Sequence, residues 1–372
     1  MYICETGNID TILNDLEQLH IEDNDLLVLF VGEENPPDIP RLIKAINERG
    51  IKMIGGIFPG IIAGNQVKMS GLAVTKFPLF AEPYRLPDHL QPSVDQFAQK
   101  LNELTFPADE KPLALVLSSN LSLTPYEASI FYEALGRILK ERVKYIGGAS
   151  GETVLRPGSY IFDNDGMFPD GTLVALVNTH MSVNHGYGWT TVGKPFIVTK
   201  SDKNVILELN GRPALKVYQE QYRLLTGEPI AAEDVNVTQK VHMGFLANRR
   251  EKIMRGVIGV TPEGGLILAG AVPPKATLFL MMSTQDAMIM NSAKLARDLA
   301  RATKSPSRAI VVECITRRIL LQDKMNEELA CVQKELAVDD IVGFLAWGEI
   351  GQLQQGSVEF LNESIVIGVE HN

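Results

Sequence analysis

The chain is poor in cysteine, and its cysteines form no pattern that suggests a metal site or a disulfide framework. Cys4, Cys314 and Cys331 are the only three in 372 residues, and no Cys-x-x-Cys pair occurs. An odd and low count of this kind is typical of a reducing compartment. We therefore expect an intracellular, cytoplasmic protein.

Long hydrophobic runs are also missing. The longest runs, residues 26–31 and 278–282, have the length of strands, whereas a helix that crosses a bilayer needs about 20 apolar residues. The first residues show no basic stretch followed by an apolar run, so we expect no signal peptide. The sequence predicts no association with a membrane.

The chain lacks any cluster of positive charge. Its net charge is −10, and Lys and Arg are spread along its length. Nucleic-acid binding needs clustered basic side chains, so we expect no nucleic-acid partner. With 45% apolar and 22% charged residues, the composition is that of an ordinary globular protein, and 372 residues suggest two domains.

The familiar catalytic motifs are absent. The nearest match to a phosphate-binding loop, residues 188–194, is followed by Pro195 where a Ser or Thr would contact magnesium. The sequence contains no G-x-S-x-G and no H-E-x-x-H, and its six histidines form no cluster with metal-ligand spacing. We therefore predict a protein that is not an enzyme.

One short phrase is repeated along the chain, and this repeat predicts the fold. It reads IKMIGG at residues 51–56, VKYIGG at 143–148 and, more loosely, IVGFLAWGEI at 341–350. Each copy follows an apolar strand and an amphipathic helix and precedes a further strand. The pattern predicts a mixed α/β fold built from repeated strand-helix-strand-strand units that form two packed domains. The helix of the third unit is expected over residues 317–336.

Residues 180–275 differ from the repeated units, because they are rich in β-forming residues and turn signals. We place the boundary between the domains in this segment, which gives a first domain over residues 1–210 with two repeated units. The second domain then covers residues 211–372 and contains the third unit.

Glycine turns at the ends of these strands suggest a ligand site. Glycine can adopt positive φ and allows close approach of a ligand to the backbone, and loops at the ends of buried strands are common binding places. We expect a cleft formed by two of the turns, whose candidate residues are Gly147, Gly148, Ser150, Glu152, Trp347, Gly348 and Glu349. The alternative is that the glycines only close turns, with Glu152 and Glu349 capping nearby N–H groups.

Three stretches resemble the FIST family of sensory proteins, which have an N-terminal and a C-terminal FIST domain. They are NHGYGWTTVGKPFIVT at residues 184–199, RGVIGVTPEGGLIL at 255–268 and GFLAWGEI at 343–350. The resemblance implies an intracellular sensor that binds a small ligand and regulates a signalling partner, such as a histidine kinase or a cyclic-di-GMP enzyme. One branch of the family binds haem non-covalently and reports nitric oxide, so the resemblance also implies haem as a candidate cofactor here. A role in two-component signalling is expected on the same ground.

The first glycine loop departs from the family pattern. Where the family often has Gly-Cys-Ser-Thr-Ala-Gly-Glu-Ile, this chain has GGIFPGII, with Ile57, Phe58 and Ile61 replacing the polar side chains. Such a loop suits an apolar ligand such as haem b, or has become part of the core. His185 and His242 are the candidate haem ligands, each with a structural role as the alternative.

The main hypothesis is a small-ligand sensor, and Arg255 is its candidate for pairing with a ligand carboxylate or a haem propionate, unless it forms a structural salt bridge. One alternative is a haem-based nitric oxide sensor that controls a histidine kinase or a cyclic-di-GMP enzyme. The other is an enzyme that acts on a small metabolite, in which the glutamates would be acid-base groups.

Overall fold

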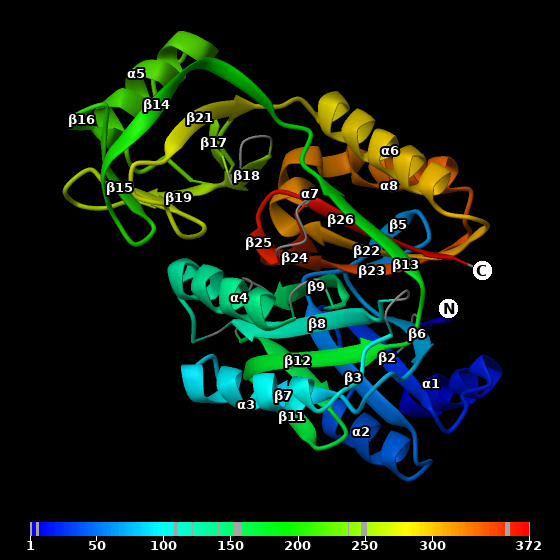
Figure 1. Ribbon diagram of the computed structural model, residues 1–372. Coiled ribbons are helices and arrows are strands. Elements are labelled where there is room, and N and C mark those ends of the chain that lie inside the picture. The colour runs from blue at the N-terminus through cyan, green and yellow to red at the C-terminus, as the bar shows by residue number, and fades with distance from the viewer. Residues whose placement is uncertain are drawn as a thin grey trace.

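The computed structural model describes residues 2–4, 7–107, 111–120, 122–139, 142–151, 158–236, 238–246, 251–353 and 358–371. Its described strands form four mixed or antiparallel sheets, and helices cover them (Figure 1). The predicted mixed α/β class is confirmed.

The three repeated units are present, each as two parallel strands joined by a helical crossover, with a later strand antiparallel to the first. In unit one these are β2 (Asp25–Gly32), α2 (Ile39–Asn47), β3 (Lys52–Phe58) and β6 (Leu72–Pro78). In unit two they are β8 (Leu113–Asn120), α4 (Pro125–Leu139), β9 (Lys144–Ser150) and β12 (Asp170–Val177). In unit three they are β22 (Pro306–Cys314), α7 (Ile315–Leu321), α8 (Met325–Leu336), β23 (Asp340–Ala346) and β26 (Ile365–His371).

The prediction of one helix over residues 317–336 was wrong. The segment forms α7 and α8 with a 3-10 turn between them, over residues 322–324. Gln322, at the end of α7, has a φ of 51°. This left-handed conformation is incompatible with a continuous right-handed helix.

The units exchange hairpins with one another. The second strand of each unit is followed by a hairpin, which leaves its own unit and extends the sheet of another. The hairpins are β4 (Ile61–Ala63) with β5 (Gln66–Lys68), β10 (Tyr160–Asp163) with β11 (Gly166–Phe168), and β24 (Glu349–Gln352) with β25 (Val358–Leu361). The hairpin of unit one pairs with β23, that of unit two with β3, and that of unit three with β9. The three units therefore interlock in a cycle.

This interlocking bears on the predicted division at residue 210. Unit three, assigned to the second domain, shares sheets with units one and two, and β13 (Met181–Gly186) also pairs with β26. The division into 1–210 and 211–372 therefore stays a prediction about how the chain is organised.

Further elements extend or cover the interlocked body. β1 (Tyr2–Cys4) pairs with β6, and β7 (Tyr84–Leu86) pairs with β12. The remaining helices of the body are α1 (Ile9–Leu16), α3 (Gln91–Asn102) and α6 (Gln285–Ala302). Its centre is apolar, and the rings of Phe58 and Phe344 stack there with centroids 3.9 Å apart.

Most of the segment between units two and three, residues 190–282, forms a separate lobe, at the upper left of Figure 1. One helix, α5 (Ala214–Thr226), packs on its antiparallel sheet. The strands are β14 (Thr190–Asp202), β15 (Val205–Leu209), β16 (Arg212–Pro213), β17 (His242–Leu246), β18 (Lys252–Arg255), β19 (Val257–Val260), β20 (Leu266–Leu268) and β21 (Thr277–Met282). The predicted β-rich character of this segment is confirmed.

Candidate ligand site

The second and third glycine segments lie side by side. Gly148 pairs with Glu349 in the β9–β24 ladder. The N–H of Ala149 donates to the carbonyl of Gly348 at 3.0 Å, and the N–H of Trp347 donates to the carbonyl of Ala149 at 2.9 Å. The two segments are thus held together by backbone hydrogen bonds, although about 200 residues separate them in the sequence.

The paired glycines of the repeat are not turns, which corrects the sequence interpretation. Gly147 and Gly148 lie inside β9, and a Cβ on Gly147 would be 2.0 Å from the carbonyl oxygen of Val116 on the parallel neighbour β8. Gly343 repeats this arrangement, with its Cβ position 1.7 Å from the carbonyl oxygen of Val311. These glycines allow close contact between strands. Gly348, with a φ of 126°, is the one of this group in a left-handed turn.

A pocket of 420 Å³ opens beside the joined segments. The interlocked body supplies the start of α4, the end of β9, Trp347 between β23 and β24, and residues of the β25–β26 region. The lobe supplies one residue from β19 and one from the loop after β20. The lining residues are Leu123, Pro125, Ala128, Ser150, Gly151, Ile258, Ala269, Trp347, Phe360 and Asn362. The pocket therefore lies between the body and the lobe.

Two of the predicted site residues line this pocket, Ser150 and Trp347. The Ser150 hydroxyl is buried, donates to the carbonyl of Ser118 at 3.2 Å and lies 2.5 Å from the hydroxyl of Ser159. Trp347 is 41% exposed. A Cβ on Gly151 would lie 2.1 Å from its indole ring, so the glycine lets the ring lie against the backbone.

Glu349 lies behind the pocket and holds the turn that follows β25. Its Oε2 accepts hydrogen bonds from the backbone N–H of Ser364 at 3.2 Å and from the Ser364 hydroxyl at 2.8 Å. Burial raises the pKa of Glu349 to about 8, against the opposing effect of these hydrogen bonds. This geometry corresponds to the capping alternative. Gly147, Gly148 and Gly348 are likewise outside the lining, and Glu152 lies outside the described residues.

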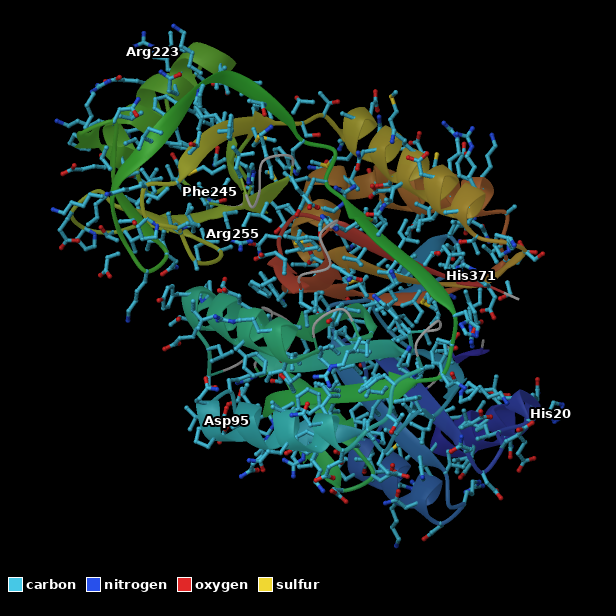
Figure 2. The ribbon with its side chains drawn as sticks, in the orientation of Figure 1. His20, Asp95, Arg223, Phe245, Arg255 and His371 are labelled. Atoms are coloured by element: carbon cyan, nitrogen blue, oxygen red, sulfur yellow. The ribbon has the colours of Figure 1, made fainter. Side chains whose placement is uncertain are left out.

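Arg255 forms structural contacts and does not line the pocket. It is 2% exposed, and it donates from Nη2 to Glu359 at 2.8 Å and from Nη1 to the carbonyl of Phe360 at 2.8 Å. Figure 2 labels it between the yellow strands of the lobe and the teal helix α4. Arg255 thus ties β18 of the lobe to β25 of the body, as its salt-bridge alternative predicted.

The two candidate haem ligands are both engaged within the protein. The Nε2 of His242 lies 2.7 Å from the carbonyl of Gln239, and its Nδ1 lies 2.5 Å from a carboxylate oxygen of Glu363. The Nε2 of His185 lies 3.3 Å from Glu251. His242 does not fit an axial ligand, because both of its ring nitrogens have protein partners. Among the described residues, no group of three or more His, Cys, Asp and Glu side chains suits a metal ion.

The first glycine loop is part of the core. Ile57, Phe58 and Ile61 are each no more than 3% exposed, and the N–H of Leu345 donates to the carbonyl of Gly60 at 2.8 Å. Phe58 and Ile61 pack with Phe344 of unit three. Ile57 packs in the core of unit one, so the replacements are core side chains and not the wall of a ligand site. This outcome corresponds to the core-packing alternative.

Most of the pocket lining was missed by sequence reasoning. Ile258 and Ala269 lie in the lobe, and Asn362 lies after β25 in a turn whose role depends on the hairpin exchange. Ile, Ala and Asn are common in strands and turns, so no local sequence pattern identifies these residues as part of a ligand site.

The chain belongs to the FIST family. A FIST N domain matches residues 25–212, and a FIST C domain matches residues 214–352. FIST domains are associated with small-ligand sensing in signal transduction. The resemblance seen in the sequence is confirmed.

Two curated proteins, from two strains of Mycobacterium tuberculosis and both described as uncharacterized, are similar to the chain. Each is 24% identical to it over 216 residues. The match covers 55% of this chain and 55% of each relative, so the chain spans about half the length of the curated relatives it matches. Within the described residues, no helix combines the length and apolar character needed to cross a membrane.

Proposed function

We propose that this protein is a cytoplasmic sensor whose ligand binds in the 420 Å³ pocket between the body and the lobe. The proposal rests on one observation: the residues that line the pocket come from both the body and the lobe. Ser150 and Trp347 come from the body, and Ile258 and Ala269 come from the lobe. An occupant would contact both parts at once, so its binding energy would favour one arrangement of the lobe over others.

The lining indicates what such a ligand would be. None of the ten lining residues carries a charge, and most are apolar. Trp347 offers a flat surface for stacking, while Asn362 and Ser150 offer polar atoms. An uncharged ligand with a ring and a few polar atoms fits this chemistry better than a charged one.

The same lining favours binding over catalysis. A catalytic pocket needs a group that can transfer a proton or attack a substrate. Ser150 is the one hydroxyl among the lining residues, and its described partners are Ser118 and Ser159 rather than a base. The enzyme alternative therefore has less support than the sensor.

The haem-based nitric oxide sensor also has less support, because His242 has two protein partners and His185 faces Glu251. We propose that the output is a change in lobe position, which a histidine kinase or a cyclic-di-GMP enzyme reads. None of the three cysteines forms a disulfide, which is typical of a reducing compartment and supports the proposed location.

A thermal-shift screen of uncharged ring-bearing metabolites tests the proposal. A ligand of the pocket should stabilise the protein, because it binds the folded state alone. Ala269→Phe fills the pocket and Trp347→Ala removes its stacking surface, so both should abolish the stabilisation. Leu224→Ala, at a residue 76% exposed on α5, is the matched control. Hits that stabilise all of these variants equally would remove this pocket from the function.

Replacing Gly348 and Glu349 with alanines is a poorer test. A Cβ on Gly348 would lie 2.2 Å from the ring of Phe360, and Glu349 is fully buried. Loss of binding in that variant would therefore not separate a missing contact from a damaged fold.

A further inference from the structure

A second pocket, of 450 Å³, lies where the chain crosses from the body to the lobe. The crossing segment, residues 187–189, joins β13 to β14. Strands β18 and β21 of the lobe and helix α6 of the body complete the wall. The lining residues are His185, Gly186, Tyr187, Gly188, Trp189, Thr190, Thr191, Glu251, Lys252, Met254, Met281 and Asn291.

The backbone of the crossing segment is firmly held. The carbonyl of Tyr187 accepts a hydrogen bond from Nη1 of Arg317 at 2.6 Å, and the carbonyl of Gly188 accepts one from the Ser283 hydroxyl at 2.5 Å. Gly188 has a φ of 77°, and a Cβ there would lie 2.7 Å from the Cα of Met288 on α6. The side chains of the segment are therefore presented from a fixed position.

Several polar atoms of the pocket wall nevertheless have no hydrogen-bond partner within the described residues. Four buried atoms in the lining lack a hydrogen-bond partner within the described part of the chain: His185 Nδ1, Tyr187 Oη, Trp189 Nε1 and Asn291 Oδ1. Buried polar groups in native proteins are almost always paired with protein or water. Four exceptions in one wall indicate a place where polar atoms are supplied from outside.

The two charged side chains of the wall have opposite signs, Glu251 and Lys252, and both already make contacts. Glu251 faces His185, and the Lys252 ammonium lies 4.7 Å from the centre of the Phe279 ring. The described charges of the wall therefore balance, which favours an uncharged occupant over a charged one. The unpartnered atoms include a donor (Trp189 Nε1), an acceptor (Asn291 Oδ1) and a hydroxyl that can do both (Tyr187).

We infer that this pocket is a second ligand site, for an uncharged polyhydroxylated compound such as a sugar or a polyol. A hydroxyl group both donates and accepts, so neighbouring hydroxyls can serve a wall of mixed donors and acceptors. The indole of Trp189 and the side chains of Met254 and Met281 offer apolar surface to the C–H faces of such a molecule. The unpartnered atoms are buried atoms of lining residues, so the proposal requires their side chains to turn toward the occupant when it binds.

The two tryptophans of the chain allow each pocket to be followed separately. Trp189 lines the second pocket and Trp347 lines the first. In Trp347→Phe, titration with D-glucose, D-ribose, myo-inositol and glycerol up to about 100 mM should give a saturable change of Trp189 emission with at least one compound. In Trp189→Phe, the emission of Trp347 reports the first pocket in the same way.

Two further variants test the contacts. Adding Tyr187→Phe to Trp347→Phe removes one hydroxyl and should weaken binding by about 3- to 10-fold. Adding Asn291→Leu should weaken it similarly, whereas Ala269→Phe, in the first pocket, should leave it unchanged. The inference is overturned if no polyhydroxylated compound gives a saturable change, or if both added substitutions leave the titration unaltered. Since the first pocket is read by Trp347, its failure as a site is distinguishable from this outcome.

Discussion

Replacing Glu349 with Gln should make the protein's stability less dependent on pH. Glu349 has no exposed surface, and its Oε1 has no partner in the described part of the chain. Burial raises its pKa to about 8 from an ordinary value of 4.5. A Gln side chain has the shape of the protonated carboxyl, and its oxygen can accept the hydrogen bonds that Ser364 donates.

The sign of the effect follows from proton binding. Because the folded pKa lies above the unfolded one, the unfolded state loses its proton first as the pH rises. Glu349 therefore does not lower the free energy of unfolding below about pH 4.5. Its destabilising effect grows as the pH rises to about 8 and is constant above that. The pKa rises from 4.5 to about 8, and each pKa unit corresponds to about 1.4 kcal/mol. The buried carboxylate can therefore lower the free energy of unfolding by at most about 5 kcal/mol at high pH.

Urea unfolding of wild type and Glu349→Gln, measured at intervals from pH 5 to pH 9, tests this reasoning. The free energy of unfolding of the variant, relative to wild type, should rise with pH by up to several kcal/mol. Glu103→Gln, at an exposed residue on the surface, is the control and should give a flat difference. A flat difference for Glu349→Gln as well would mean that the folded protein holds this carboxyl ionised, and would refute the argument.

Two further predictions concern buried groups with matched controls. Tyr218→Phe should lose about 1–3 kcal/mol of stability because the Tyr218 hydroxyl donates to a buried carbonyl at 2.8 Å, whereas Tyr187→Phe should keep or gain stability because its hydroxyl has no described partner. Equal losses in thermal or urea unfolding would show that Tyr187 already has a partner. Gly147→Ala should lose about 1–3 kcal/mol or more, because its Cβ would meet the carbonyl of Val116 at 2.0 Å. Gly259→Ala, where the nearest atom is 3.8 Å away, should be tolerated, and similar unfolding curves for the two variants would contradict the steric argument.

The repeat made the three-unit architecture predictable. A buried apolar strand, a helix with one apolar face and a second strand have clear periodicities, and each unit shows them in the same order. The glycines of the repeat also have a structural cause, which is close contact between parallel strands. The sequence could not distinguish this use of glycine from its use in a turn. Gly55, Gly147 and Gly343 pair with Leu29, Val116 and Val311, so they occupy equivalent positions across from the parallel neighbour.

The pocket lining was largely beyond prediction, because it depends on pairings between distant segments. Nothing in residues 349–361 indicates that they pair with β9 rather than with their own sheet. Phe360 and Asn362 reach the pocket only through that exchange, and Ile258 and Ala269 reach it only through the placement of the lobe. Glu349 stood out as a carboxylate beside a glycine, but its role depends on Ser364, which the turn after β25 brings close.

The hairpin exchange also suggests where the molecule can move. Units one, two and three each hold a strand pair of another unit, so moving one unit away from the others would break ladders in two sheets. The lobe has its own sheet and joins the body through side chains, such as Arg255, and through the crossing segment. Both pockets lie at this boundary. An occupant of either pocket would therefore act on the position of the lobe. In Trp347→Phe, whose emission comes from Trp189, filling the first pocket should change the apparent Kd of the second if the two sites are coupled. An unchanged Kd would show that the pockets act independently.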